Sequence, residues 1–520
     1  MTVRIQQEIK KELNEMISSL NRLLSILFII GTSLAASYNL ASAQSYTSGT
    51  SGFPDAPPTA APVPYSSAQH LPAYAADASL DSRISALEDA LKKKQDKPDP
   101  KKGFTATLNG RAYFDSYSVS NQEGANGGPA TLSSLSNYNG LRDLRIGVRG
   151  TGYEILDYNL DFCLIEATGS NSSGNYNSGE SDKSSFNNSG INLKDAWLAV
   201  KNVPLLEYVK IGHYRLEDGV SVLTGGTQTS FFEFDGRDFG TGRRIGISSR
   251  HLWAKDTIRF FAGFFYDRDI ATNTRFNRLD DQGSITNFRL TFLPFASRDE
   301  KGKIDGKKFL FFGGNYSYYD LSKSATGAQS ASFNQRFGGL QLNSLQSYTI
   351  LTNSYNKFGL EFVYQNGHKT LQSEFYANAY NSVAIGGKTE DRTIYGTYVT
   401  FKYFLTGDYR TFSADNAAWG AVKLKHNLDL KKINDLNRAE WIGGLEFVAK
   451  WAYTDTSDFN GYSGFTGSVN DVTLGLNWYW SPQARWMFDY VHVIPSRYRE
   501  AGGRDHSDTD IFAASFRYHF

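Results

Sequence analysis

Basic side chains recur at alternate positions in segments whose other face is apolar. In the segment LRDLRIGVRG (141–150), Arg145 and Arg149 share one face with Asp143, whereas Leu144 and Ile146 occupy the other. Guanidinium groups gathered on one face attract anions through the field that they create in the neighbouring water. This pattern therefore supports electrostatic selection of solutes rather than the making or breaking of bonds.

The same alternation collects a larger basic set on the polar face of the chain. Its members are Arg111, Arg145, Arg149, Arg244, Arg250, Arg259, Arg289, Lys402, Lys450 and Arg517. The acidic residues that point the same way are fewer, namely Asp143, Asp161, Glu374, Glu440 and Glu446. A basic, water-filled lumen that favours anions is one interpretation. The other is that ladders of arginine and acid brace a wall without selecting any solute, and both interpretations stay open.

The elements that must position these side chains are β-strands, and the last strand is the most informative. In TDIFAASFRYHF (509–520), Phe512, Phe516 and Phe520 lie on one face, and Ser515 and Arg517 lie on the other. An apolar outer face, a polar inner face and a terminal aromatic residue are typical of the closing strand of an outer-membrane β-barrel. Assembly machinery reads such a terminus, so we expect it to recognise Phe520. The edge strand of a soluble sandwich would also alternate.

Counting such segments predicts an all-β fold, a transmembrane antiparallel β-barrel of about sixteen strands with a short N-terminal periplasmic helix. An even number returns both termini to the periplasm, where the tight links 366–368 and 481–484 should also lie. The Gly/Ser/Asn-rich spans 121–140 and 167–190 should be extracellular loops. Residues 406–437 fall on the periplasmic side and are long for a turn.

The N-terminal part of the chain predicts export. Arg22 precedes an apolar run at 23–36 and an Ala-x-Ala cleavage site, so residues 1–43 are predicted to be a signal peptide. Translation from Met16 would give a signal peptide of ordinary length. Residues 44–79 are rich in Pro, Ala and Ser and predict an extended linker.

Residues 80–102 predict a short periplasmic helix followed by a lysine-rich tether, and the barrel is expected over residues 103–520. Apolar residues in this helix repeat at coiled-coil spacing, at Leu80, Ile84, Leu87 and Leu91. So short a helix needs partners, which favours self-association of several copies, although it could also pack on its own barrel or fray.

Composition agrees with a strand protein in a membrane and excludes other classes. Aromatic residues make up 14% of the chain, while mean hydropathy is −0.42. A net charge of +1 implies no nucleic-acid partner, and the single Cys163 excludes an internal disulfide framework. No residue set has the spacing of a metal site, a cofactor site or a catalytic triad, so we expect no cofactor, no metal and no enzyme activity.

The third extracellular loop, 216–241, carries aromatic and charged residues that a merely solvated loop would not need. We expect it to fold inward and to bring its charged residues against the basic wall. The acidic and basic loop residues concerned are Glu217, Asp218, Glu233, Asp235, Arg237 and Asp238. The predicted lining of the constriction is Arg111, Arg145, Arg149, Arg215, Glu233, Asp235, Arg237, Asp238, Arg243, Arg244, Arg250, Arg259, Arg289 and Lys402.

Several motifs resemble the phosphate-selective porin O and P family over about 103–520. The most specific are YVTFKYFLTGDYR (398–410), VTLGLNWYWSPQARWMFDYVHV (472–493) and DTDIFAASFRYHF (508–520). The resemblance implies a homotrimeric sixteen-stranded porin in outer-membrane lipid, constricted by its third loop and passing small anions, in some members phosphate. This chain departs at 215–218 and 232–235, where the loop gains acid and loses base, so phosphate selectivity does not follow.

The expected function is therefore an outer-membrane porin for passive diffusion of small ions and hydrophilic solutes, with a weak anion preference. The alternative is a structural envelope protein that tethers the outer membrane to the cell wall through its periplasmic segment. Ion conductance would separate the two.

Overall fold

The computed structural model describes residues 103–120, 138–166, 192–233, 239–267, 283–323, 329–336, 344–385, 387–432, 441–459, 466–499, 503–505 and 508–520. These belong to the compact unit Phe104–Phe520. The predicted signal peptide, linker and coiled-coil helix lie outside the described residues. Within the described part, no helix is long and apolar enough to cross a membrane.

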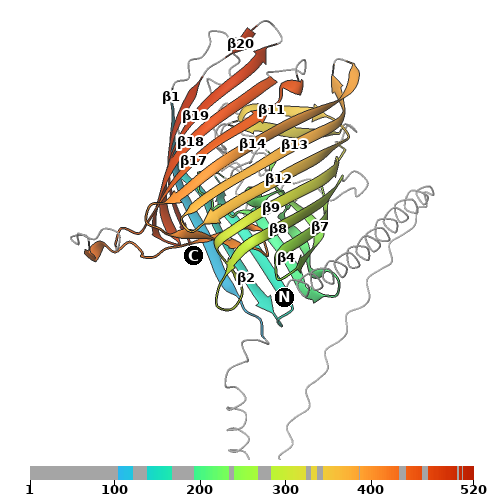
Figure 1. Ribbon diagram of the computed structural model, residues 1–520. Coiled ribbons are helices and arrows are strands. Elements are labelled where there is room, and N and C mark those ends of the chain that lie inside the picture. Colours follow the sequence, from blue (N-terminus) through green and yellow to red (C-terminus); the bar gives the residue numbers. More distant parts are fainter. Residues whose placement is uncertain are drawn as a thin grey trace, which may run out of the picture. The chain divides into compact units, whose positions relative to one another are not determined.

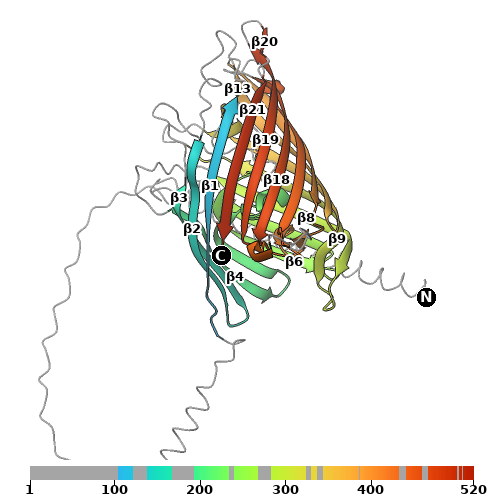
Figure 2. The ribbon, with the colours of Figure 1, turned by 90° about the vertical axis from the view of Figure 1, so that its left-hand side faces the viewer.

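The unit is a closed antiparallel β-barrel of 16 strands (Figures 1 and 2), which confirms the predicted fold class. Each wall strand pairs with the next wall strand along the chain, and the last pairs with the first from Arg111↔His519 to Ser120↔Asp510. The wall strands are β1 (Thr107–Ser120), β2 (Tyr138–Gly152), β3 (Leu156–Glu166), β4 (Asn192–Val203), β5 (Glu207–Arg215), β6 (Arg243–Trp253), β7 (Ile258–Tyr266), β8 (Ser284–Arg298), β9 (Ile304–Asp320), β12 (Ser354–Asn366), β13 (Lys369–Ile385), β14 (Lys388–Phe404), β17 (Gly444–Asp455), β18 (Thr466–Ser481), β19 (Ala484–Arg499) and β21 (Thr509–His519).

Alternation along each strand explains why these segments form a barrel in lipid. On β21, Phe512 and Tyr518 are exposed on the outer face, whereas Ser515 and Arg517 are buried on the inner face. Because successive side chains point to opposite sides, one face meets hydrocarbon and the other meets the lumen. The links 366–368 and 481–484 lie at the end of the barrel that holds both of its termini, which is the periplasmic end of such barrels.

Two hairpins are not part of the barrel wall. One is β10 (Ser330–Arg336) with β11 (Ser344–Leu351), in the connection from β9 to β12. The other is β15 (Tyr409–Ser413) with β16 (Ala418–Lys423), in the long periplasmic connection from β14 to β17. A short strand, β20 (Gly503–Asp505), extends the pairing of β19.

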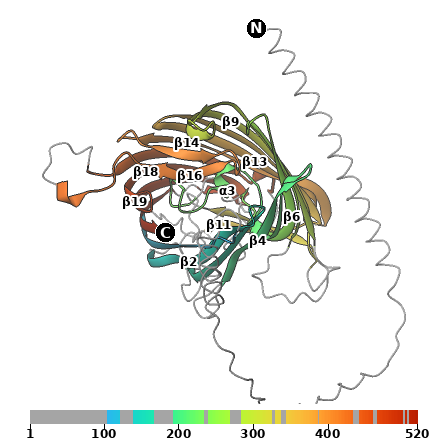
Figure 3. The same ribbon diagram turned by 90° about the horizontal axis from the view of Figure 1, so that it is seen from below.

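Two short 3-10 helices, Leu430–Lys432 and Ser457–Phe459, and one four-residue α-helix, α3 (Val220–Leu223), complete the described elements. Seen from below, α3 and β16 both lie inside the ring of wall strands (Figure 3). The barrel interior is therefore occupied by segments from both of its ends.

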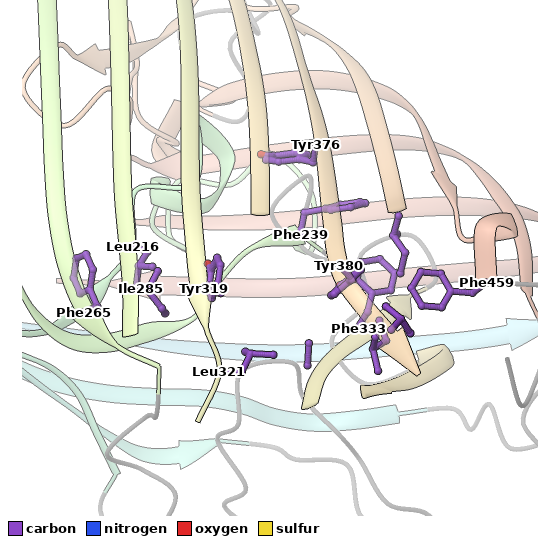
Figure 4. Close-up of a cluster of buried hydrophobic side chains, with 14 of the residues drawn as sticks. Leu216, Phe239, Phe265, Ile285, Tyr319, Leu321, Phe333, Tyr376, Tyr380 and Phe459 are labelled. Carbon is purple, nitrogen blue, oxygen red and sulfur yellow. The ribbon is translucent and has the colours of Figure 1, made fainter. Parts of the chain in front are cut away.

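Apolar packing holds these inner segments to the wall. Phe239 stacks on Tyr376 of β13, with ring centroids 5.5 Å apart, and contacts Phe333 of the β10–β11 hairpin (Figure 4). A second cluster joins Phe412 and Trp419 of the β15–β16 hairpin to Phe309 of the wall. These clusters fix the position of the polar groups described next.

Candidate pore and its inward-folded segments

The connection between β5 and β6, residues 216–242 and here called L3, is fixed at its first turn by buried ion pairs. Glu217 accepts a hydrogen bond from Arg259 at 2.6 Å and a longer one from Arg289 at 3.5 Å. Asp218 lies 2.9 Å from the ammonium of Lys357. Burial alone would raise the pKa of Glu217, but the two arginines hold it below its ordinary value. These loop acids are therefore neutralised by the wall.

The helix α3 then rests on two carboxylates of the wall. The backbone N–H of Val220 donates to Glu361 at 2.9 Å, and that of Ser221 donates to Glu374 at 3.3 Å. Gly219 precedes the helix with φ of 144°, and a Cβ there would lie 2.8 Å from a carboxylate oxygen of Glu374. Only glycine fits this close approach without strain.

The second half of L3 crosses to the opposite wall. Arg517 of β21 donates to the carbonyl of Gly226 and the hydroxyl of Thr229, each at 2.8 Å. The N–H of Phe232 donates to Asp489 of β19 at 2.8 Å. Glu233, a predicted lining residue, is buried in an ion pair with Arg142. L3 therefore spans the lumen from β7–β9 to β19–β21.

The β15–β16 hairpin, here called the lumen hairpin, enters from the periplasmic end and meets L3. The indole N–H of Trp419 donates to Gln372 at 2.8 Å, and its backbone N–H donates to Thr224 of L3 at 3.4 Å. Carbonyls at the hairpin tip accept hydrogen bonds from three predicted lining residues. Asp415 accepts from Arg250 at 2.9 Å and from Arg259 at 2.7 Å, and Ala417 accepts from Arg289 at 3.0 Å.

Arg410 ties the lumen hairpin to both L3 and the wall. Its guanidinium donates to Glu446 at 3.1 Å and to Tyr479 at 2.7 Å, and it also donates to the carbonyl of Gln228. The residues concerned, apart from Gln228, are buried. Residues 406–437 are thus long for a turn because part of them folds into the barrel.

Together, L3 and the lumen hairpin bury the lumen face of most of the wall. From β7 through β21, lumen-facing side chains such as Arg289, Glu374, Thr400 and Asn477 are at most 1% exposed. Among the described residues, the lumen face of β3–β6, here called the open arc, has partly exposed side chains on four neighbouring strands. They are Asn159, Asp161, Asp195, Trp197, Tyr208, Lys210, Arg244 and Arg250. Residues 225–228, which lie beside β1 and β21, are the most exposed stretch of the described part of L3.

Paired charges flank the open arc. On β1 and β2, Asp143 lies between Arg111 at 2.7 Å and Arg145 at 2.9 Å. Arg243 at the top of β6 is 3.0 Å from Asp195 of β4. In contrast, Lys210, Arg244 and Arg250 make no ion pair with a carboxylate among the described residues. These cations leave the open arc with a basic balance.

The predicted lining residues therefore occupy different environments. Arg244 and Arg250 lie on the open arc, and the ladder of Arg111 and Arg145 adjoins it, while Arg149 is exposed near the periplasmic turn after β2. Arg215 donates to the carbonyl of Val222 within L3 at 2.7 Å. Asp235, Arg237 and Asp238 lie outside the described residues.

The prediction that Arg259, Arg289 and Lys402 line a water-filled path needs correction. They face the lumen, but they are 2%, 1% and 5% exposed because L3 and the lumen hairpin cover them. Arg259 forms an ion pair with Glu217 of L3, and Arg289 forms one with Glu361 of the wall. Lys402 lies over the ring of Trp419. At these three positions the basic residues stabilise the wall and the segments inside it, as the second interpretation of the basic face describes.

Sequence reasoning missed Lys210, Lys357, Glu361 and Arg410. The first three alternate with apolar residues of their own strands, so strict alternation along β5 and β12 would have placed them on the lumen face. For Arg410, the signal was the alternation in YRTFS and AWGAVK on either side of a turn containing Asp415 and Asn416.

A closed 16-stranded antiparallel barrel with an apolar outer face and an inward-folded third loop defines an outer-membrane channel of the porin class. The sequence matches the phosphate-selective porin O and P family over residues 100–520, and the chain belongs to that family. It is an outer-membrane porin through which small solutes diffuse. Among curated protein sequences, none matches it.

Solved structures with a similar fold are distant in sequence. A loop L8 deletion mutant of OmpT of Vibrio cholerae is 11% identical with a TM-score of 0.45, covering 81% of this chain and 100% of its own. The outer membrane channel DcaP of Acinetobacter baumannii is 9% identical with a TM-score of 0.45, covering 80% and 98%. An anion-selective porin from Comamonas acidovorans is 12% identical with a TM-score of 0.44, covering 80% and 100%.

Proposed function

We propose that this porin is a passive channel with a weak preference for small anions and no catalytic role. The observation that supports the preference is the charge of the open arc. Lys210, Arg244 and Arg250 have no carboxylate partner there among the described residues, whereas Asp195 is paired with Arg243. A solute moving along this wall meets an excess of positive charge, which raises the local concentration of anions.

The buried acids of L3 do not oppose this preference. Glu217, Asp218 and Glu233 each contact a cation of the wall at buried positions, so they present little net charge to the lumen. Exposed charges act over about 8–10 Å at physiological ionic strength, so the side chains beside the path dominate. The preference is weak because the arginines of the ladder share Asp143, and because Asp161 and Asp195 lie on the same face as the cations of the open arc.

Reversal potentials of the purified full chain in a planar bilayer under a KCl gradient test this proposal. Wild type should favour chloride, and the double variant Arg244→Ala with Arg250→Ala should shift the potential toward that of potassium. The double variant Lys301→Ala with Lys303→Ala removes the same charge from an exposed periplasmic turn and should leave the potential unchanged. If the Arg244/Arg250 variant keeps the wild-type preference, the electrostatic proposal is wrong.

We also propose that the porin is a homotrimer, and that outer-membrane assembly machinery recognises Phe520 during insertion. The apolar seam at Leu80, Ile84, Leu87 and Leu91 supports association, because so short a helix is not stable alone in water. At the other end, Phe520 lies on the outer face and exchanges two backbone hydrogen bonds with Gly110, each 3.1 Å long. The mass of the detergent-solubilised protein by light scattering tests the trimer: a monomer would contradict it.

A further inference from the structure

Aromatic rings and cations alternate on the lumen face of β4, β5 and β6. The ammonium of Lys210 lies 4.8 Å from the ring centroid of Trp197 and 4.6 Å from that of Tyr214. The guanidinium of Arg250 lies 4.3 Å from the ring centroid of Tyr208. These five residues are here called the aromatic–basic patch; four of them are partly exposed and belong to the open arc, and Tyr214 is buried beneath Lys210.

The register of the strands explains why the patch is contiguous. Tyr208 pairs directly with Arg250, and Lys210 pairs with Ser248, so the two cations are diagonal neighbours on adjacent strands. Diagonal neighbours of this kind are within reach of the same small ligand. Trp197 pairs with Gly212 of β5, which has no side chain, and Lys210, two residues away on β5, reaches the indole ring.

The patch differs from the ion pairs that brace the wall. Lys201, whose register partner is Tyr208, lies 2.8 Å from the carboxylate of Asp157. Lys210 and Arg250 contact no carboxylate among the described residues, and Arg250 donates instead to the carbonyl of Asp415 and the amide oxygen of Asn416. Both of those residues at the tip of the lumen hairpin are exposed. The patch is therefore reachable by a solute and its cations are not neutralised.

The partly exposed rings of Trp197 and Tyr208 indicate a ligand other than an inorganic anion. A small anion such as phosphate or acetate would use only the two cations. A carboxylate that carries a planar ring can pair its charge with Lys210 or Arg250 and at the same time stack its ring on Trp197 or Tyr208. Each cation already lies over a ring, so little side-chain freedom is lost on binding.

We propose that the aromatic–basic patch is a binding subsite for carboxylates that carry an aromatic ring. The proposal deepens the proposed function and rests on its channel part, since the ligand must first enter the lumen. It assigns a role to Trp197 and Tyr208 that electrostatic selection alone would not need.

The test uses the full chain in a planar bilayer, with benzoate, acetate and inorganic phosphate as probes of the chloride current. Benzoate should reduce the current at a concentration about fivefold lower than acetate, since a ring stacked beside a cation contributes on the order of that factor. Phosphate should act no more strongly than acetate at equal charge. Equal action of benzoate and acetate would overturn the proposal.

Two variants separate the ring contribution from the charge. Trp197→Leu keeps both cations, so it should abolish the difference between benzoate and acetate while leaving the reversal potential in KCl unchanged. Lys210→Met should weaken block by both carboxylates and shift the reversal potential toward potassium. Lys201→Met removes the same charge from a paired lysine in the neighbouring row and should preserve the ratio of benzoate to acetate.

The outcomes distinguish this proposal from the proposed function. If wild type shows no anion preference but benzoate still acts more strongly than acetate, the weak-anion proposal is wrong and the subsite stands. If wild type prefers anions and Trp197→Leu leaves the benzoate ratio unchanged, the subsite is wrong and the anion preference stands. Heat-modifiable migration of each variant on gels confirms that it is a folded barrel.

Discussion

Arg289 joins the wall, L3 and the lumen hairpin, so its replacement should loosen the segments that fill the barrel. Its guanidinium is 1% exposed, donates to Glu361 at 2.9 and 2.6 Å, and reaches Glu217 and the carbonyl of Ala417. Removing one partner of such a buried pair costs about 3–5 kcal/mol, because the remaining carboxylate is left uncompensated. For Arg289→Met, we expect this free energy to weaken the attachment of L3 to the wall, because Glu361 also accepts a hydrogen bond from the N–H of Val220.

A free energy of that size changes a local opening equilibrium by about 10² to 10⁴-fold. Single-channel recordings in KCl should therefore show larger current fluctuations and a state of higher conductance for Arg289→Met than for wild type. Adding Glu361→Gln removes the uncompensated charge while keeping an oxygen for Val220, and it should restore a quiet channel. Arg298→Met on the same strand, at an exposed periplasmic turn, should behave as wild type. A quiet, unchanged conductance in Arg289→Met would refute the inference that this arginine holds L3.

The remaining predictions concern assembly, orientation and association. Replacing Phe520 with Ser should leave protease-sensitive protein in the periplasm, and normal heat-modifiable migration would count against recognition of the terminus. Cysteine at Ser173 should react with an impermeant maleimide in intact cells, whereas cysteine at Gln483 should react only after permeabilisation; surface labelling of the latter would reverse the orientation. Replacing Ile84 and Leu87 with Glu should lower the melting temperature of the trimer, and an unchanged melting curve would show that the coil does not contribute.

The barrel was predictable from the sequence because every wall strand needs an apolar face toward the lipid. Each wall strand must present apolar side chains at every second position, as Phe512, Ala514, Phe516 and Tyr518 do on β21, so the signal repeats sixteen times along the chain. Local sequence is sufficient for this property, since it depends on neighbours two residues apart.

The interior was less predictable because its contacts join residues far apart in the chain. Arg289 and Glu217 are separated by 72 residues, and Arg410 and the carbonyl of Gln228 by 182. The alternation of side chains along a strand indicates that an arginine points inward, but it does not indicate whether a loop will cover that arginine. For this reason Arg244 and Arg289 have the same sequence pattern but very different exposure.

The lumen hairpin shows the same limit in another form. The length of residues 406–437 indicated that something other than a turn was present, but not that β15 and β16 enter the barrel. Their inward position depends on the packing of Phe412 and Trp419 against Phe309 and on the hydrogen bonds that three arginines donate to carbonyls at the tip. Each of these partners lies on a different part of the chain.

The way L3 is anchored also determines which residues can select solutes. Acids that are taken out of water must be paired, so Glu217 and Asp218 occupy cations of β7–β12 that would otherwise attract anions. Pairing removes both charges from the field that a solute meets. Selectivity is thereby left to the part of the wall that L3 does not cover, where Lys210, Arg244 and Arg250 remain partly exposed. The added acid in L3, because of which phosphate selectivity does not follow from the sequence, is compatible with an anion preference that the open arc provides.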